Sequence, residues 1–327
     1  MSKSPKITLV TPCFNSAKYI EQTILSIIKQ DYENLEYIII DGGSTDGTVE
    51  IIQKYEDKIT YWISEPDQGQ SDAINKGISR ATGDLFNWIN ADDYLESNAL
   101  SQVAKAFSTN EIDIFCTNTL LFNEHGIIRM NGGETMELNL FKLLNASGLN
   151  QMGMYWSLPI IRKLNGVNSA FNYSMDLDLF KRYLLTFGSS KILFQNIITG
   201  YFRLSSDSKT GSEFDSNFHL FENENHAALS QYASVAGPNY VKSIQILFPT
   251  TKMDLADVPV HSRILENSVK AWMTDLFYES AKKLFYHNQF KETYQLVKAL
   301  PFRDFEDQKR KNLNSFYRWS MLRKWIQ

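Results

Sequence analysis

Short apolar runs alternate with amphipathic segments through residues 1–125. The runs are rich in β-branched side chains and predict strands at 6–11, 36–40, 59–64, 85–89, 112–116 and 119–122. Between them, apolar side chains recur every three or four positions and predict helices at 20–28, 48–55, 70–81 and 95–107. This alternation predicts an α/β fold with a Rossmann-like, mostly parallel sheet that carries helices on both faces.

The pattern changes beyond residue 125. It predicts helices at 136–145 and 171–183, one further segment at 156–164 and a strand at 192–203. After residue 214 the helical patterns become long and rich in aromatic residues, with a hairpin formed by 268–285 and 291–300. We therefore expect a sheet-containing domain at 1–215, with halves 1–125 and 126–215, and a helical C-terminal region at 216–327.

Composition and charge narrow the class of protein. The chain has 327 residues, 43% of them hydrophobic, and a formal net charge of −4, which is typical of a globular protein and argues against a nucleic-acid partner. The two cysteines, Cys13 and Cys116, form no Cys-x-x-Cys motif, which favours a reducing compartment and excludes a cysteine zinc site. We expect neither a signal peptide nor a membrane-spanning helix, and hence a cytoplasmic location.

Polar side chains gather where three of the predicted strands end, at 11–15, 41–46 and 90–93. Ligands of open parallel sheets bind outside the carboxyl ends of the strands, so we expect these clusters to meet at one edge of the sheet. The last cluster contains two adjacent acids, Asp92 and Asp93, whose like charges need compensation if they are buried. A divalent metal is one explanation, and capping of the next helix is the other.

Four motifs carry a resemblance to a known family. They are Val10-Thr-Pro-Cys-Phe-Asn, Asp41-Gly-Gly-Ser-Thr-Asp-Gly-Thr, Glu65-Pro-Asp-Gln-Gly followed by Asp72-Ala-Ile-Asn-Lys-Gly, and Asn90-Ala-Asp-Asp. In this order and spacing they resemble the family 2 inverting glycosyltransferases with the GT-A fold. The third motif resembles a branch that is common in bacterial cell-surface polysaccharide synthesis. The resemblance covers residues 5–215, and the remaining residues resemble no family that we can name.

The resemblance implies a nucleotide-sugar donor, with UDP as the expected nucleotide, and a saccharide or lipid-linked saccharide acceptor. It implies that Asp41 accepts a hydrogen bond from the uracil imide, while Phe14 and its neighbours line the base. Core packing of Phe14 and a surface salt bridge between Asp72 and Lys76 are the alternatives. The nucleotide-binding residues expected are Thr11, Pro12, Phe14, Asn15, Asp41, Gly43, Ser44, Asp72, Lys76, Asn90, Ala91 and Asp92.

The resemblance also implies bound Mn²⁺ or Mg²⁺, with Asp92 as its ligand and Asp93 as a second candidate. The family's Asp-x-Asp motif falls on Asn90-Ala-Asp92, so its first acid is an amide in this chain. The family usually has Glu-Asp where this chain has Met175-Asp176, which assigns the catalytic base to Asp176. Asp178 is the rival, and both acids also suit the first turn of a helix.

Four further residues match stretches that border the acceptor or the diphosphate in relatives. Gln151 and Trp156 match the acceptor side, and the alternative is that they belong to the core. Arg203 and Lys209 match a basic loop that could reach the diphosphate, and the alternative is a solvated loop charge.

Two other functions compete with metal-dependent glycosyl transfer. A dinucleotide-dependent oxidoreductase needs Gly-x-Gly-x-x-Gly after the first strand, but residues 11–16 read Thr-Pro-Cys-Phe-Asn-Ser. A non-catalytic nucleotide-sugar-binding assembly subunit stays open, because Asn90 and Met175 replace family acids. The basic, aromatic tail at 309–327 fits contact with the inner membrane surface, packing within the protein, or a homo-oligomer formed through the C-terminal helices.

Overall fold

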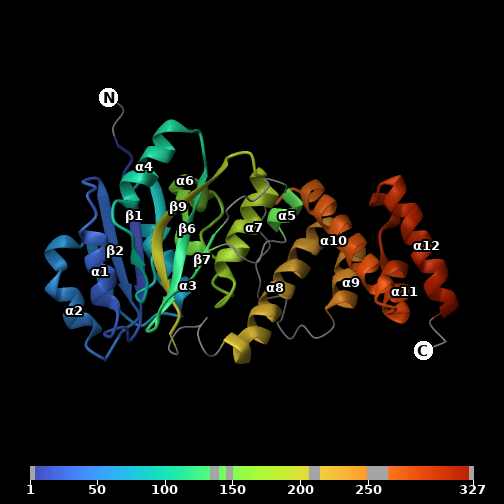
Figure 1. Ribbon diagram of the computed structural model, residues 1–327, viewed down its shortest axis with the longest axis horizontal. Coiled ribbons are helices and arrows are strands. Elements are labelled where there is room, and N and C mark those ends of the chain that lie inside the picture. Colours follow the sequence, from blue (N-terminus) through green and yellow to red (C-terminus); the bar gives the residue numbers. More distant parts are fainter. Residues whose placement is uncertain (1–3, 133–139, 145–149, 206–213, 249–263, 324–327) are drawn as a thin grey trace. The chain divides into compact units, whose positions relative to one another are not determined.

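A computed structural model describes residues 4–132, 140–144, 150–205, 214–248 and 264–323 (Figure 1). The chain divides into two compact units. The first, here called the sheet unit, comprises residues 1–180 and 188–218, and the second, the helical unit, comprises 181–187 and 219–327. The division near residue 218 lies close to the expected one at 215, but part of one helix, 181–187, groups with the helical unit.

Four parallel strands begin the sheet. They are β1 (Ile7–Cys13), β2 (Leu35–Asp41), β3 (Tyr61–Ser64) and β4 (Leu85–Trp88), in the order β3-β2-β1-β4. The register pairs Cys13 with Asp41 and Asp41 with Ser64, so these strands end side by side. Parallel pairing therefore delivers the polar segments after β1 and β2 to the same edge, as the sequence predicts.

The sheet continues from β4 through strands of mixed direction, in the order β4-β8-β6-β9-β5, and β7 pairs with β6. These strands are β5 (Tyr94–Leu95), β6 (Ile114–Asn123), β7 (Gly126–Asn131), β8 (Met154–Ser157) and β9 (Ile192–Arg203). β5 pairs antiparallel with β9, matching Tyr94 with Tyr201. That pairing fixes the chain just after Asp93 to the end of β9.

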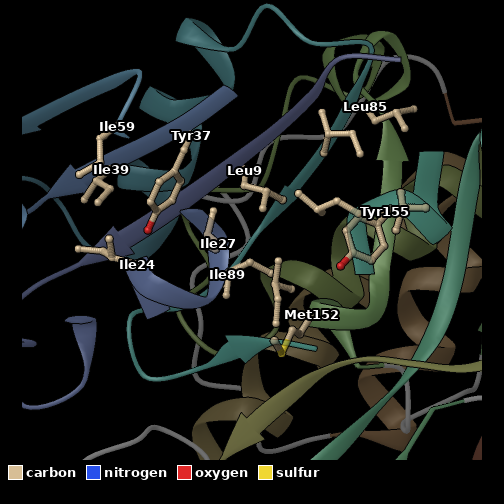
Figure 2. Packing of buried hydrophobic residues seen from close by; sticks show 14 of the residues in the cluster. Leu9, Ile24, Ile27, Tyr37, Ile39, Ile59, Leu85, Ile89, Met152 and Tyr155 are labelled. Atoms are coloured by element: carbon tan, nitrogen blue, oxygen red, sulfur yellow. The ribbon is translucent and has the colours of Figure 1, made fainter. Parts of the chain in front are cut away.

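Helices cover both faces of the parallel strands. The helices of the sheet unit are α1 (Ile20–Ile28), α2 (Thr48–Lys54), α3 (Gln70–Arg80), α4 (Ala99–Thr109), α5 (Leu140–Leu144), α6 (Leu158–Lys163) and α7 (Met175–Phe187), which runs into the helical unit. Side chains of α1, α2 and α4 pack with one face of β1 and β2 in a single core, where Ile24 and Ile27 lie beside Tyr37 and Ile39 (Figure 2). On the other face α3 approaches so closely that a Cβ on Gly77 would lie 2.5 Å from Val10 Cγ1.

The helical unit contains α8 (Phe214–Ala236), which begins in the sheet unit, α9 (Pro238–Leu247), α10 (Glu266–Tyr286), α11 (Phe290–Ala299) and α12 (Asp307–Arg323). The last three pack against one another (Figure 1). α12 buries Leu313, Phe316 and Ser320, three to four residues apart, while Trp319 stays 49% exposed. The described part of the tail thus packs within the protein along one face. Among the described helices, none has the length and apolarity to cross a bilayer.

Several details differ from the sequence prediction. The two strands expected at 112–116 and 119–122 are one strand, β6, whose register with β9 shifts around Asn118. β7 is exposed along nearly its whole length, so it lacks the alternation that would have revealed it. The segment at 156–164 divides into β8 and α6, and the helix expected at 95 begins at Ala99 because β5 precedes it.

Candidate functional site

The loops that follow β1 and β2 are held together at the carboxyl edge of the sheet. Asn15 N donates to Ser44 Oγ (2.7 Å), and Thr45 N donates to Asn15 Oδ1 (3.0 Å). Ala17 N donates to Asp46 Oδ2 at 3.0 Å. Asn15 adopts a positive φ of 47°, a conformation that asparagine tolerates better than most residues. Two of the three polar clusters that the sequence predicts to meet, 11–15 and 41–46, therefore lie together.

Asp41 is buried at the centre of this arrangement. Its carboxylate accepts from the backbone N of Gly43 (3.1 Å) and Ser44 (2.9 Å), and from the hydroxyls of Ser44 (2.5 Å) and Ser64 (2.6 Å). Burial alone would raise the pKa of Asp41, but the hydrogen bonds from Ser44 and Ser64 outweigh it and lower the pKa below its usual value. The side chain is thus an ionised acceptor that shapes the loop after β2.

The segment 65–72 joins this edge to the start of α7. A Cβ on Gly42 would lie 2.9 Å from Asp67 Oδ2, so the loop after β2 packs closely against the Asp67 side chain. Ser71 Oγ donates to Phe171 O (2.7 Å) and contacts Met175 Sδ (3.2 Å). Gln70 Nε2 donates to Asn90 Oδ1 at 2.7 Å. Through these contacts, α7 and the acidic turn after β4 lie on either side of the first turn of α3.

The two acids of that turn have different environments. Asp93 is 1% exposed, and its carboxylate accepts from Arg203 N (2.8 Å) and Asn90 Nδ2 (3.3 Å). Burial, followed by the charge of Asp92, raises the pKa of Asp93 well above its usual value. Asp92 is half-buried, and burial also raises its pKa. In the part of the chain that the structure describes, no other side chain bonds the Asp92 carboxylate.

The two candidate bases also differ in exposure. Asp176 is half-buried and its Oδ1 accepts from Leu177 N at 2.8 Å. Asp178 is only 4% exposed and lies deeper in the helix packing. A base must reach the proton that it removes, so the geometry favours Asp176.

The residues expected to line the nucleobase differ in how exposed they are. Phe14 is 62% exposed, so it does not belong to the core. Thr11 is fully buried and its hydroxyl bonds Tyr37 Oη at 3.1 Å, while Pro12 is also buried. Among these residues, Phe14 is therefore the side chain on which a nucleobase could stack.

Lys76 contacts acids of its own loop and helix. Its Nζ lies 2.9 Å from Glu65 and 3.5 Å from Asp72. The hydrogen bond that Lys76 donates to the Glu65 carboxylate raises the pKa of Lys76. The salt bridge considered from the sequence is present, and a phosphate role for Lys76 would require it to open.

The acceptor and diphosphate candidates are mostly structural. Trp156 is 1% exposed and packs edge-to-face on Phe180, so it is a core residue. Gln151 Nε2 donates to Asn87 Oδ1 (2.8 Å) and Trp88 O (2.7 Å), bracing the end of β4. The Arg203 guanidinium bonds Asp92 O (2.9 Å) and is therefore not a solvated loop charge. Lys209 lies outside the described residues.

The side-chain oxygens of the acidic turn after β4 fit a metal ion whose other ligands come mostly from a bound substrate. No group of three or more His, Cys, Asp and Glu side chains forms a metal cage within the described ranges. Mg²⁺ and Mn²⁺ bound to nucleotides are typically held by one or two carboxylates, with phosphate oxygens and water completing the shell. Asp92 offers one such carboxylate, and Asn90 Oδ1 is already engaged by Gln70.

Sequence reasoning missed two residues that hold the acidic turn. Thr23, fully buried on α1, contacts the carbonyls of Ala91 and Asp93. Gln70 fixes the amide of Asn90. The sequence does show a threonine on the otherwise apolar face of a predicted helix. The hydrophobic pattern, however, cannot connect that threonine to a turn 68 residues away.

Comparison with known proteins identifies the family and the fold. Over 190 residues the chain is 26% identical to an uncharacterised glycosyltransferase of Rickettsia typhi, a match spanning 55% of this chain and 59% of the relative. The structure of S. aureus TarS 1–349 in complex with UDP superposes with a TM-score of 0.57 and 15% identity, covering 98% of this chain and 91% of TarS 1–349. Mannosyltransferase PcManGT from Pyrobaculum calidifontis, in complex with GDP-Man and Mn²⁺, has a TM-score of 0.51 and 15% identity, covering 91% and 86% of the two chains.

These structural likenesses, together with the family match, confirm the predicted α/β architecture of the GT-A type followed by a helical region. The family profile described as "Glycosyl transferase family 2" matches residues 8–171, which is half of the 327-residue chain. The matched range contains the loops that follow β1, β2 and β4. The chain therefore belongs to glycosyl transferase family 2, and the protein is a glycosyltransferase.

Proposed function

We propose that the protein transfers a sugar from a UDP-sugar to a saccharide acceptor by a single displacement that inverts the anomeric centre. The observation that carries this proposal is the meeting of the loops after β1, β2 and β4 with the start of α7 at one sheet edge. That edge combines an ionised nucleotide-facing acid, a half-buried acid without a side-chain partner among the described residues, and a second accessible acid, Asp176.

The nucleotide half of the site supplies shape and polarity for a base. Phe14, 62% exposed, offers an aromatic face on which a base can stack. Asp41 holds the adjoining loop, and its carboxylate is fully buried and already accepts from Gly43, Ser44 and Ser64. A bond from an imide N–H would therefore require one of these donors to move. UDP is the proposed nucleotide, and TarS, with which the chain shares its fold, has been solved with UDP.

The acidic turn is the place for the donor's diphosphate. Asp92 would hold a divalent cation there, and that cation would supply the positive charge that stabilises the leaving diphosphate. Asp93 is not proposed as a ligand, because its oxygens accept from Arg203 N and the Asn90 amide inside the protein. Mn²⁺ and Mg²⁺ both suit an all-oxygen environment of this kind.

Asp176 is proposed as the base that removes the proton from the acceptor hydroxyl. Leu177 N donates to Asp176 Oδ1 and holds that oxygen at the start of α7. Met175, which replaces the family's glutamate, brings no second charge beside it. A saccharide or lipid-linked saccharide is the acceptor class proposed from the family.

Product formation from panels of UDP-sugars and GDP-sugars, with saccharide acceptors and Mn²⁺, tests this proposal. We expect turnover with a UDP-sugar, and loss of at least a hundredfold in kcat for Asp176→Asn, because general-base catalysis contributes that much. Asp57→Asn is the matched control, since Asp57 is exposed and contacts only its neighbour Lys58 among the described ion pairs. UDP binding without turnover for any pair would instead identify a non-catalytic nucleotide-sugar-binding subunit.

A further inference from the structure

A buried threonine on α1, Thr23, hydrogen-bonds the turn formed by Asn90–Asp93. Thr23 Oγ1 lies 2.9 Å from Ala91 O and 2.6 Å from Asp93 O, so its single proton is shared between two carbonyls of the turn. Thr23 is fully buried. Within the turn itself, Asp93 N donates to Asn90 O at 3.1 Å.

Arg203, at the end of β9, also hydrogen-bonds this turn. Its backbone N donates to Asp93 Oδ1 (2.8 Å), and its Nε donates to Asp92 O (2.9 Å). Its Nη2 donates to Gln22 Oε1 on α1 at 2.6 Å. All four backbone carbonyls from Asn90 to Asp93 are therefore engaged, by the turn itself, by Thr23 and by Arg203.

Aromatic side chains fix the arginine in place. Its Cζ lies 4.5 Å from the ring centroid of Tyr19 and 4.5 Å from that of Phe122. Attraction between the cation and the ring faces favours this position of the guanidinium. The stacked pair Tyr94 and Tyr201, 4.5 Å apart, holds the adjoining strands together.

We propose that Thr23 and Arg203 are positioning residues that preorganise the Asp92 carboxylate for a nucleotide-bound divalent cation. The proposal rests on the function proposed above. Every backbone oxygen of the turn is committed to the protein, whereas Asp92 is the turn acid whose oxygens no other described side chain engages. Mutating the groups that hold a metal ligand in place typically lowers metal affinity about 10- to 100-fold. Arg203 thereby acts on the diphosphate site through the turn rather than by touching phosphate.

Mn²⁺ binding to the full chain in the presence of UDP, followed by electron paramagnetic resonance, tests this role without requiring turnover. Thr23→Val and Arg203→Lys should each raise the Kd for Mn²⁺ by about 10-fold or more. In transfer assays, both variants should recover kcat at saturating Mn²⁺, whereas their affinity for UDP without metal should be unchanged. A residue that only supports folding would not produce this dependence on Mn²⁺.

Two matched controls separate positioning from stability. Arg80→Lys changes an arginine whose Cζ also lies 4.5 Å from an aromatic ring, that of Tyr61, but which has no contact with the turn among those described. Thr293→Val changes a fully buried threonine whose Oγ1 lies 2.6 Å from a backbone carbonyl, in the helical unit. Both controls should leave the Kd for Mn²⁺ unchanged.

The proposal is overturned if wild-type protein with UDP binds no Mn²⁺, or if folded Thr23→Val and Arg203→Lys bind Mn²⁺ as tightly as wild type. Failure of the proposed function has a different signature, since a chain that binds Mn²⁺ with UDP yet transfers no sugar would refute only the enzymatic reaction. A weaker Mn²⁺ affinity in the variants would still establish the positioning role in that case.

Discussion

Replacing Glu36 by glutamine should destabilise the sheet unit, and the loss should depend on pH. Glu36 is the second residue of β2 and is 4% exposed. Its carboxylate accepts from Lys6 Nζ (2.8 Å), Thr8 Oγ1 (2.6 Å), Thr82 N (2.7 Å) and Thr82 Oγ1 (2.5 Å). These bonds join β1, β2 and the loop before β4. In Glu36→Gln, an amide donor group would face some of these donors and leave them unsatisfied.

The magnitude follows from the pKa of Glu36. Burial by itself would raise the pKa, but the hydrogen bonds from Lys6, Thr8 and Thr82 lower it from 4.5 to about 2. Each pKa unit corresponds to about 1.4 kcal/mol, so ionised Glu36 stabilises the folded state by about 3 kcal/mol at neutral pH. For a unit of this size, that is a decrease in Tm of about 6–12 °C on substitution.

The sign of the pH dependence follows from the direction of the shift. The folded pKa is depressed, so the stabilisation is fully present above the unfolded value of 4.5 and is lost as pH falls toward about 2. The difference in Tm between wild type and Glu36→Gln should therefore be greatest at pH 7 and fall to less than half by pH 3.

Thermal unfolding at pH 7, 5, 4 and 3, followed by circular dichroism, measures this difference. Glu33→Gln is the control, because Glu33 is exposed and lies in the segment just before β2. An equal Tm for Glu36→Gln and wild type at pH 7, or a difference that stays constant down to pH 3, would refute the reasoning.

Three other predictions concern single residues. Phe14→Ala should leave Tm unchanged, because the ring is 62% exposed, but it should raise the Kd for UDP in calorimetry by about tenfold through lost stacking; an unchanged Kd would place the base elsewhere. Gly77→Ala should lower stability to chemical denaturation by about 1–3 kcal/mol, because its Cβ would lie 2.5 Å from Val10 Cγ1; a stability equal to wild type would contradict the close approach of α3. Asp93→Asn should lower Tm but leave the Kd for Mn²⁺ with UDP nearly unchanged, because the buried carboxylate bonds Arg203 N. An unchanged Tm with a raised Kd for Mn²⁺ would make Asp93 a ligand.

Much of the candidate site was predictable because it depends on local patterns and one topological rule. The strands ending at Cys13 and Asp41 could be located from continuous apolar runs. Parallel strands bring their carboxyl ends to one edge, so the meeting of the loops followed without coordinates. The exposure of Phe14 was left open, because an aromatic residue after a strand fits either the core or a ligand site.

The parts that escaped prediction depend on contacts between distant segments. Arg203 bonds Asp92 across 111 positions, and Thr23 bonds Asp93 across 70. No periodicity encodes such pairs. β5 is only two residues long and is defined by its pairing with β9. Trp156 fitted an acceptor role by resemblance alone, whereas its burial follows from antiparallel pairing of β8 with both β4 and β6.

The proposed reaction is inverting sugar transfer with Asp176 as the base. Its most direct test is nuclear magnetic resonance of the product formed from an α-linked UDP-sugar and a saccharide acceptor, with wild type and Asp176→Asn side by side. Wild type should form a β-linked product, and the variant should form it at least a hundredfold more slowly. An α-linked product, or undiminished transfer by Asp176→Asn, would rule out this reaction.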